Sequence, residues 1–208
     1  MIGSRSMETT SPRVFVYGSF CEGMVHYAKI SRFLEDIRPA RVRGSAYRLE
    51  VGYPVYLQQG EDWVPGQSVR VRAPDVLFPI LDEWNGFSPL RPEKSLFLKV
   101  EVEVTLVDSG HVEKAFTYAL NPSKLPKTAQ LIEGGDWKGA LAKAPSLVDT
   151  LTDRQIEYIG RLGSSTGRQI VPIDLQLYRE LMKLDLIVDK GRRLALSALG
   201  KEVYRYLP

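Results

Sequence analysis

The pattern of hydrophobic and polar positions is clearest in the middle of the chain, from Leu98 to Val107. Apolar residues there take every second position, between charged or hydroxyl side chains. This alternation predicts a strand with one buried and one solvated face. A turn at Ser109-Gly110 and a second strand, from Val112 to Leu120, follow. The stretch therefore predicts an antiparallel hairpin.

Shorter apolar runs predict further strands before this hairpin. Residues 14–16 are β-branched or aromatic and form a buried strand that stops at Gly18, a residue type that adopts positive φ without steric cost. Residues 40–72 read as short strands separated by Gly and Pro, with a hairpin turn at Gly60-Glu61-Asp62.

Helical spacing of apolar residues predicts amphipathic helices over residues 25–37 and 74–85. Pro74 suits the first helical position and Asp75 the first turn. Residues 131–140 then close a first domain around Trp137.

The last third of the chain predicts a second, smaller unit. Residues 144–150 read as a linker, and the Thr-x-x-Gln pattern at Thr152 is typical of a capping box that opens a helix through Leu162. A helix over 175–184, a tight hairpin over 186–196 and a last helix capped by Ser197 follow.

Helix, helix, hairpin, helix is an order that resembles a winged-helix module. In such a module, polar and basic side chains of the second helix and the wing contact DNA. The residues in those places are Gln176, Arg179, Lys183, Lys190, Arg192 and Arg193. The same surface also suits a protein partner, and both interpretations stay open.

Composition limits the class of protein. The chain has 208 residues, 44% hydrophobic and 25% charged, without an apolar run of eighteen residues, so we expect no membrane span. Residues 1–12 lack the apolar core of a signal peptide and read as a disordered, partly vector-derived leader with a natural start at Met7. The single cysteine predicts a reducing, cytoplasmic location.

The net charge of +3 is unevenly distributed. Residues 151–208 hold 10 Lys/Arg and 7 Asp/Glu, a net of +3, whereas residues 1–150 hold 18 of each sign. The excess is too small to require a nucleic-acid partner, but it lies in the predicted winged-helix-like unit.

A set of motifs, in order along residues 13–140, resembles the gamma-glutamylcyclotransferase-like family. The opening motif is Val-Phe-Val-Tyr-Gly-Ser-Phe, which begins at Val14. The later matches are Gly44-Ser-Ala-Tyr-Arg-Leu49, Gly52-Tyr-Pro54, Val64-Pro-Gly66, Leu81-Asp-Glu-Trp-Asn-Gly-Phe87, Ala115-Phe-Thr-Tyr118 and Gly135-Asp-Trp137.

The resemblance implies an α+β fold, a mixed β-barrel with flanking helices. We expect it to span residues 13–143, with the linker over 144–150 and the winged-helix-like domain over 151–208.

The resemblance also implies a chemistry. Enzymes of this family let the α-amine of a γ-glutamyl substrate attack its own γ-carbonyl, which releases 5-oxoproline and an amine without metal or cofactor. Holding the glutamyl chain folded supplies much of the acceleration. One Glu moves the proton, and the amides of the Tyr-Gly-Ser loop hold the glutamyl group. The matching loop here is Tyr17, Gly18, Ser19 and Phe20.

The sequence departs from the family's pattern at the catalytic glutamate, whose position is taken by Asn85. A carboxamide can orient an amine but cannot carry its proton. Glu83, Glu93 and Glu22 are candidate substitutes, although each reads better as a solvated surface carboxylate.

Cys21 adjoins the loop but has the character of a small buried hydrophobe. His26 and His111 show no telling spacing, and two histidines with one cysteine do not predict a metal site.

Three hypotheses follow. We favour a catalytically degenerate module that binds a γ-glutamyl- or amino-acid-like small molecule through Tyr17–Phe20 and Asn85, with a C-terminal interaction module. The second is an active enzyme that releases 5-oxoproline with a relocated base such as Glu83. The third is a regulator with a vestigial cavity that contacts DNA or protein through residues 151–208.

Overall fold

A closed five-stranded β-barrel forms the first part of the protein. The computed structural model describes residues 11–165 and 169–207, so most of the predicted leader, with the expected start at Met7, lies outside the described residues. The strands run in the order β3-β1-β5-β4-β2, and β2 pairs again with β3, which closes the barrel. The strands are β1 (Arg13–Val16), β2 (Leu34–Arg48), β3 (Pro54–Val71), β4 (Phe97–Leu106) and β5 (Val112–Leu120), with β6 (Gln130–Ile132) added to the outer edge of β2.

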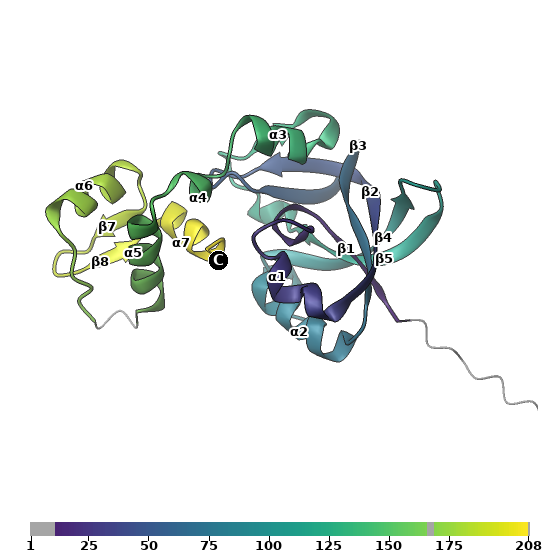
Figure 1. Ribbon diagram of the computed structural model, residues 1–208, viewed down its shortest axis with the longest axis horizontal. Coiled ribbons are helices and arrows are strands. Elements are labelled where there is room, and N and C mark those ends of the chain that lie inside the picture. The colour runs from purple at the N-terminus through teal and green to yellow at the C-terminus, as the bar shows by residue number, and fades with distance from the viewer. Residues whose placement is uncertain (1–10, 166–168, 208) are drawn as a thin grey trace, which may run out of the picture.

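Short helices flank the barrel. Figure 1 shows α1 and α2 on one side of the strands and α3 on the other. The flanking elements are η1 (Gly18–Phe20), α1 (Tyr27–Ile30), η2 (Ser31–Phe33), α2 (Pro74–Trp84), η3 (Pro92–Lys94), η4 (Pro122–Lys124), η5 (Glu133–Gly135) and α3 (Trp137–Lys143). Both predicted hairpin strands and the 74–85 helix form within one or two residues of the expected bounds.

Two predictions for this region are wrong. The helix expected over 25–37 ends at Ile30, because Leu34 begins β2 and pairs with Val71 of β3. Gly60-Glu61-Asp62 does not turn a hairpin; these residues lie within β3, beside a bulge between the pairs Gly44–Asp62 and Ser45–Leu57. The chain reverses instead at residues 49–53, so two long strands replace the expected series of short ones.

The C-terminal module comprises the elements that follow residue 151. They are α5 (Asp153–Ser164), α6 (Leu175–Lys183), β7 (Ile187–Asp189), β8 (Leu194–Leu196) and α7 (Ala198–Arg205). Thr152 and Gln155 form the expected capping box at the start of α5. The element order agrees with the sequence; the assignment to the winged-helix class stays a prediction.

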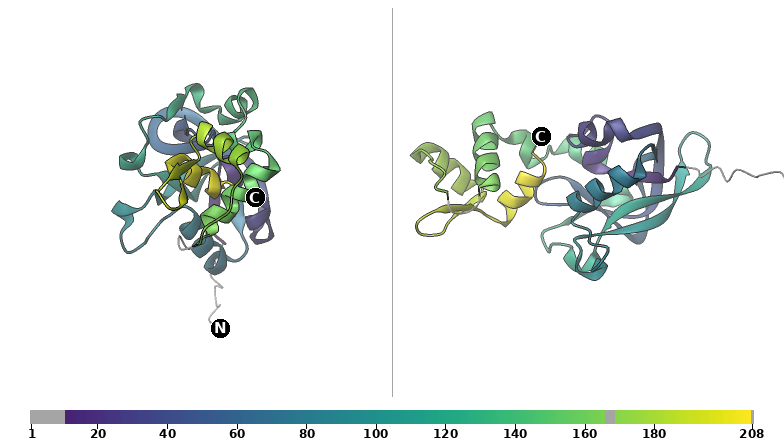
Figure 2. Two further views of the ribbon diagram at one scale, coloured as in Figure 1. Left: turned by 90° about the vertical axis from the view of Figure 1, so that its left-hand side faces the viewer. Right: turned by 90° about the horizontal axis from the view of Figure 1, so that it is seen from below.

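The segment that joins the two parts is more ordered than the expected linker. It contains α4 (Leu147–Thr150), which opens with a capping box between Ser146 and Asp149. In two views at right angles the barrel and the module stand side by side, and α7 lies between them (Figures 1 and 2).

Each part has its own hydrophobic core. The barrel core contains the inward residues of β1–β5 together with Leu77 and Leu81 of α2. The second core gathers residues of α4 to α7 and also Val51 and Tyr53, from the connection between β2 and β3. The module therefore packs on the barrel through shared apolar residues. No helix among residues 11–165 and 169–207 is long and apolar enough to cross a membrane.

Candidate functional site

The loop after β1 and the end of α2 meet at a small inner cavity. Tyr17, Ser19, Phe20 and Asn85 line this cavity together, and its volume is about 40 Å³. The structure thus brings Asn85 to the Tyr-Gly-Ser loop, although Asn85 lies 65 positions after Phe20 in the sequence. Apolar side chains of β1, α2 and β4 complete the wall.

Backbone geometry and two hydrogen bonds fix the loop. Gly18 is buried at φ +58°, and a Cβ on it would lie 3.0 Å from Cγ of Pro54, so glycine is required. The Tyr17 hydroxyl donates to the carbonyl of Tyr118 at 2.9 Å and accepts from the Tyr56 N–H at 3.2 Å. Burial raises the pKa of this phenol. Tyr17 therefore ties the loop to β3 and β5 as a neutral group.

Asn85 is a buried cap of α2. Its side-chain amide donates from Nδ2 to the carbonyl of Leu81 at 2.8 Å, and 7% of the residue is exposed. The group is neutral at every working pH, so it offers the cavity an acceptor oxygen but no titrating proton.

A carboxylate lies one helical turn earlier, at Asp82, but it does not line either cavity described in this subsection. The Tyr118 hydroxyl donates to Asp82 Oδ1, and Lys99 Nζ lies 3.5 Å from the same oxygen. Burial, and secondarily this carboxylate, raise the pKa of Tyr118. Asp82 is therefore engaged in a structural pair beside the site.

A histidine that the sequence analysis passed over contacts the loop directly. His26 Nδ1 lies 3.0 Å from Ser19 Oγ, and Nε2 lies 3.1 Å from the carbonyl oxygen of Arg205. A carbonyl only accepts, so Nε2 carries the proton and Ser19 donates to Nδ1. Burial, aided by Lys29, lowers the pKa of His26 to about 4. This neutral histidine joins the Tyr-Gly-Ser loop to the end of α7.

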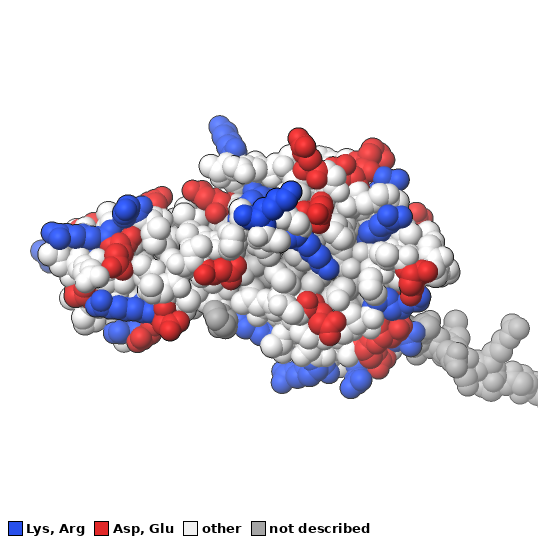
Figure 3. Space-filling view, turned by 45° about the horizontal axis from the view of Figure 1, so that its top comes forward, with Lys and Arg blue, Asp and Glu red and all other residues white. Residues whose placement is uncertain are grey.

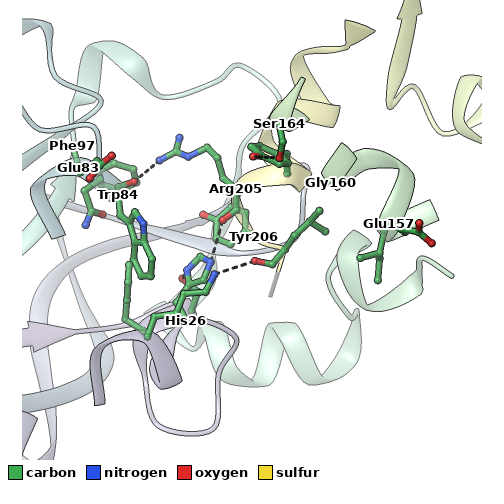
Figure 4. A pocket seen from close by; sticks show the side chains of 16 residues that line it. His26, Glu83, Trp84, Phe97, Glu157, Gly160, Ser164, Arg205 and Tyr206 are labelled. Atoms are coloured by element: carbon green, nitrogen blue, oxygen red, sulfur yellow. Dashed lines mark hydrogen bonds between the residues drawn. The ribbon is translucent and has the colours of Figure 1, made fainter. Parts of the chain in front are cut away.

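A larger outer cavity, of about 740 Å³, opens where the barrel meets the C-terminal module. Ser19, Phe20 and Asn85 line it as well as the inner cavity, and Glu83 joins them here. The opposite wall comes from α5 and α7 (Figure 4). Glu83, the expected substitute base, is thus beside Asn85 but in the outer cavity and exposed.

Charged side chains surround the outer cavity. Lys29 Nζ donates to the carbonyl of Leu207 at 3.3 Å and lies 5.2 Å from the ring centre of Trp84. Arg205 Nη2 donates to the carbonyl of Trp84 at 3.0 Å, and Figure 4 shows its side chain extending toward that residue. Within residues 11–165 and 169–207, neither cation forms an ion pair. Both cations therefore stand beside the cavity without a carboxylate at ion-pair distance in that part of the chain, although the Glu202 carboxyl interacts electrostatically with Arg205.

Tyr206 separates the two cavities and lines both. Its ring stacks on Tyr53 with centroids 4.3 Å apart and on His26 at 5.5 Å. Burial raises the pKa of Tyr206 to about 12. A residue of the C-terminal module therefore forms part of the wall of the cavity that the barrel motifs predict.

The remaining candidate residues lie elsewhere. The Cys21 thiol is buried and donates to the carbonyl of Val16 at 3.4 Å; burial raises its pKa to about 12. Glu22 and Glu93 are exposed and line neither cavity. Among the described residues, no three His, Cys, Asp or Glu side chains are grouped so that they could hold a metal ion.

The five basic residues proposed to contact DNA or protein also lie outside both cavities. All five are exposed, on α6 and around the β7–β8 hairpin: Arg179, Lys183, Lys190, Arg192 and Arg193. In the face shown in Figure 3, basic and acidic side chains are interspersed over both parts of the molecule.

Solved structures with a similar arrangement come from several organisms. They include a mouse AIG2-like protein (15% identity, TM-score 0.45, covering 56% of this chain and 80% of that one). YkqA of Bacillus subtilis has 20% identity and a TM-score of 0.48, over 64% of this chain and 42% of its own. An Arabidopsis thaliana protein has 23% identity and a TM-score of 0.47, over 82% and 97%.

No curated protein matches the chain. The model of the family described as gamma-glutamyl cyclotransferase, AIG2-like, matches residues 14–139. This match spans the barrel from β1 to α3, well over half of the chain. The chain therefore belongs to the gamma-glutamyl cyclotransferase, AIG2-like family.

Proposed function

We propose that this protein is a catalytically silent member of its family that binds an amino-acid-like small molecule of γ-glutamyl type. Tyr17–Phe20 and Asn85 hold the ligand, and the C-terminal module contacts a further partner. The observation that carries the proposal is the neutral amide of Asn85 at the position where the family's motif has glutamate.

The lack of a group that can accept the proton supports the absence of catalytic activity. The cyclisation needs a group that takes a proton from the α-ammonium, and loss of a general base costs about 10²–10⁴ in rate. Asn85 cannot take it, and its Nδ2 is already engaged with Leu81. Asp82, a partly buried carboxylate of α2, is engaged by Tyr118 and Lys99.

The charges around the outer cavity support the ligand class. An amino-acid-like molecule carries a carboxylate and an ammonium. Lys29 and Arg205 are cations whose hydrogen bonds here go to main-chain carbonyls, bonds that water or a carboxylate can replace. Glu83 offers the matching acceptor for an ammonium on the same wall.

Calorimetry and product analysis test the proposal. γ-L-Glutamyl-L-alanine and L-glutamine are titrated into the purified full chain, and the mixtures are searched for 5-oxoproline by mass spectrometry. We expect saturable heat with at least one ligand and no product. Asn85→Glu is expected to raise product formation at least a hundredfold over the wild-type background. Asn85→Gln is the matched neutral control and is expected to give none.

Two results would overturn the proposal: 5-oxoproline formed by the wild type at enzyme-like rates, or no saturable heat with any γ-glutamyl ligand.

A relocated base is the second candidate function, because Glu83 lines the outer cavity together with Asn85. In that case the wild type releases 5-oxoproline and Glu83→Gln abolishes it, whereas the exposed Glu93→Gln leaves it unchanged. Absence of product from both wild type and Asn85→Glu removes this candidate.

The C-terminal module carries a separate proposal, a DNA or protein contact through its exposed basic residues. A mobility shift with duplex DNA at two salt concentrations tests the DNA form. Binding that weakens with salt and is lost in the Arg192→Ala/Arg193→Ala double variant would support it. Without a salt-sensitive shift, the protein contact is preferred.

A further inference from the structure

The chain just after α7 lies between the inner and outer cavities. Tyr206 lines both of them, and on its inner side only about 40 Å³ remains free. Ligand pockets usually measure roughly 300–1,000 Å³, so this space does not take an amino-acid-like ligand. On its outer side about 740 Å³ is available, within the usual range for ligand sites.

Hydrogen bonds to the main chain hold Tyr206 in this place. Its neighbours on either side are fixed by the barrel: His26 Nε2 donates to the carbonyl of Arg205 at 3.1 Å, and Lys29 Nζ donates to that of Leu207 at 3.3 Å. The Arg205 side chain donates a third hydrogen bond, from the module to the carbonyl of Trp84 in the barrel region. Three polar contacts and the ring stacks on Tyr53 and His26 thus hold Tyr206 between the two cavities.

The same histidine connects the closure to the ligand loop. Ser19 donates to Nδ1 of His26 while Nε2 donates to Arg205, so one imidazole bonds both the Tyr-Gly-Ser loop and the end of α7. A ligand that uses the Ser19 hydroxyl as a donor would remove a bond that orients this ring.

The position of Tyr206 is coupled to the module through α7. Val203 is fully buried in the second core, and a Cβ on Gly200 would clash with the carbonyl oxygen of Leu186. Helix α7 is therefore packed tightly against the rest of the module. Residues 204–207 continue directly from this packed part of α7 and contain no glycine or proline. A tilt of the module therefore displaces Tyr206.

We propose that Tyr206 is a built-in gate, held shut by His26 and Lys29, which must swing into the outer cavity before a ligand enters the inner one. Ligand binding then opens the contact between barrel and module, and a partner that tilts the module opens the cavity. This inference rests on the proposed function for the nature of the ligand, but the gate itself can be tested without one.

A thiol placed behind the gate measures its opening. Thr117→Cys is built with Cys21→Ser, so that the chain has one cysteine, at a buried position that lines the inner cavity but not the outer one. Its rate of modification by methyl methanethiosulfonate is measured on the full chain. We expect Tyr206→Ala to raise the rate at least tenfold and Tyr206→Phe, which keeps the ring, to change it less than twofold.

The matched control is Tyr204→Ala, two residues earlier on α7. Tyr204 is exposed, lines the outer but not the inner cavity, and forms a hydrogen bond with Ser164 of the module. We expect less than a twofold change in rate. Equal acceleration by both alanine variants would mean general loosening, and no acceleration by Tyr206→Ala would mean no gate; either result overturns the proposal.

A variant that leaves Tyr206 in place guards against misfolding as the cause. Lys29→Met keeps most of the side-chain length but removes the bond to Leu207, and it is expected to raise the thiol rate about threefold with unchanged circular dichroism. An unchanged rate would contradict the gate. Because none of these measurements uses a ligand, their failure is distinct from an absence of heat with γ-L-glutamyl-L-alanine.

Discussion

The inner and outer cavities differ in origin, size and charge. The inner cavity is lined mainly by the barrel, holds about 40 Å³, and presents neutral groups such as Tyr17 and Asn85. The outer cavity draws half of its wall from the C-terminal module, measures about 740 Å³ and is surrounded by Lys29, Glu83 and Arg205. The motif residues Ser19, Phe20 and Asn85 line both cavities, whereas Tyr17 lines only the smaller, neutral one of the two.

The comparison shows which part of the protein provides room for a ligand. The barrel leaves little room beside its own motif residues, so the room for a ligand depends on how the module packs against it. Variants that loosen the module should therefore change the outer cavity while they leave the inner wall intact. Variants of the barrel should do the reverse.

The largest effect is expected from Gly200→Ala. The added methyl meets the main chain of Leu186, which cannot move aside as a flexible side chain can. Overpacking of this kind costs about 3 kcal/mol or more of the module's stability. Since all three tryptophans (Trp63, Trp84 and Trp137) lie in the barrel region, urea unfolding is followed by tryptophan emission and by far-ultraviolet circular dichroism.

In that experiment we expect an early circular dichroism transition for the module, and a later tryptophan transition near that of the wild type. If both signals shifted together, the barrel and the module would unfold as one unit. The contrast between the two cavities would then have no separate energetic basis.

The sequence predicts a feature of this fold well when the residues that determine it are close together in the chain, and poorly when they are far apart. The β4–β5 hairpin and the capping box at Thr152 are local, so alternation and spacing find them. The predicted helix over 25–37 fails because Leu34 pairs with Val71, a contact 37 residues away that helical spacing does not encode.

The site divides in the same way. The resemblance of the Tyr-Gly-Ser and Leu-Asp-x-x-Asn segments brought Tyr17–Phe20 and Asn85 forward as one site. His26 was missed because its partners are Ser19, in an irregular turn, and Arg205, 179 residues later. Tyr206 reads from the sequence as an ordinary residue near the end of an amphipathic helix, and nothing local marks its place over a distant cavity.

The next effect concerns His26, which sits where the two cavities meet. The groups that face it are Ser19, the cations Lys29 and Arg205, and the rings of Phe20, Trp84 and Tyr206. Because the folded protein holds the pKa of this imidazole at about 4, the unfolded chain binds more protons below pH 6.5. Stability is therefore full above about pH 6.5 and falls as the pH drops toward 4.

Between pH 7 and pH 5 we expect a loss of about 2 kcal/mol in the free energy of unfolding, measured in urea. The carboxyl groups with lowered pKa, such as Asp36 and Asp174, lose their contribution at lower pH. His26→Gln keeps a donor for the Arg205 carbonyl but does not titrate, so its stability should stay flat across this window. A wild-type profile equally flat would show that the imidazole is more solvated than its burial indicates.

The smallest effect tests the outer cavity from its module side, at Gly160 of α5. Glycine inside a helix is less favourable than alanine by about 1 kcal/mol. A Cβ on Gly160 would approach only Leu207, at 3.9 Å, which is ordinary contact. Gly160→Ala is therefore expected to stabilise the module by about 0.5–1 kcal/mol in the circular dichroism transition, without moving the tryptophan transition.

The same substitution reports on the chain after α7. With Leu207 in its place beside α5, the new methyl adds a contact to the closed arrangement, so the stabilisation should shrink when Lys29→Met releases Leu207. An identical gain in both backgrounds would assign the whole effect to helix propensity. Destabilisation by Gly160→Ala would instead mean that the Leu207 side chain lies closer to a Cβ at position 160 than 3.9 Å, so that the added methyl clashes with it. The outer cavity would then be narrower on the side of α5 than on the side of the barrel.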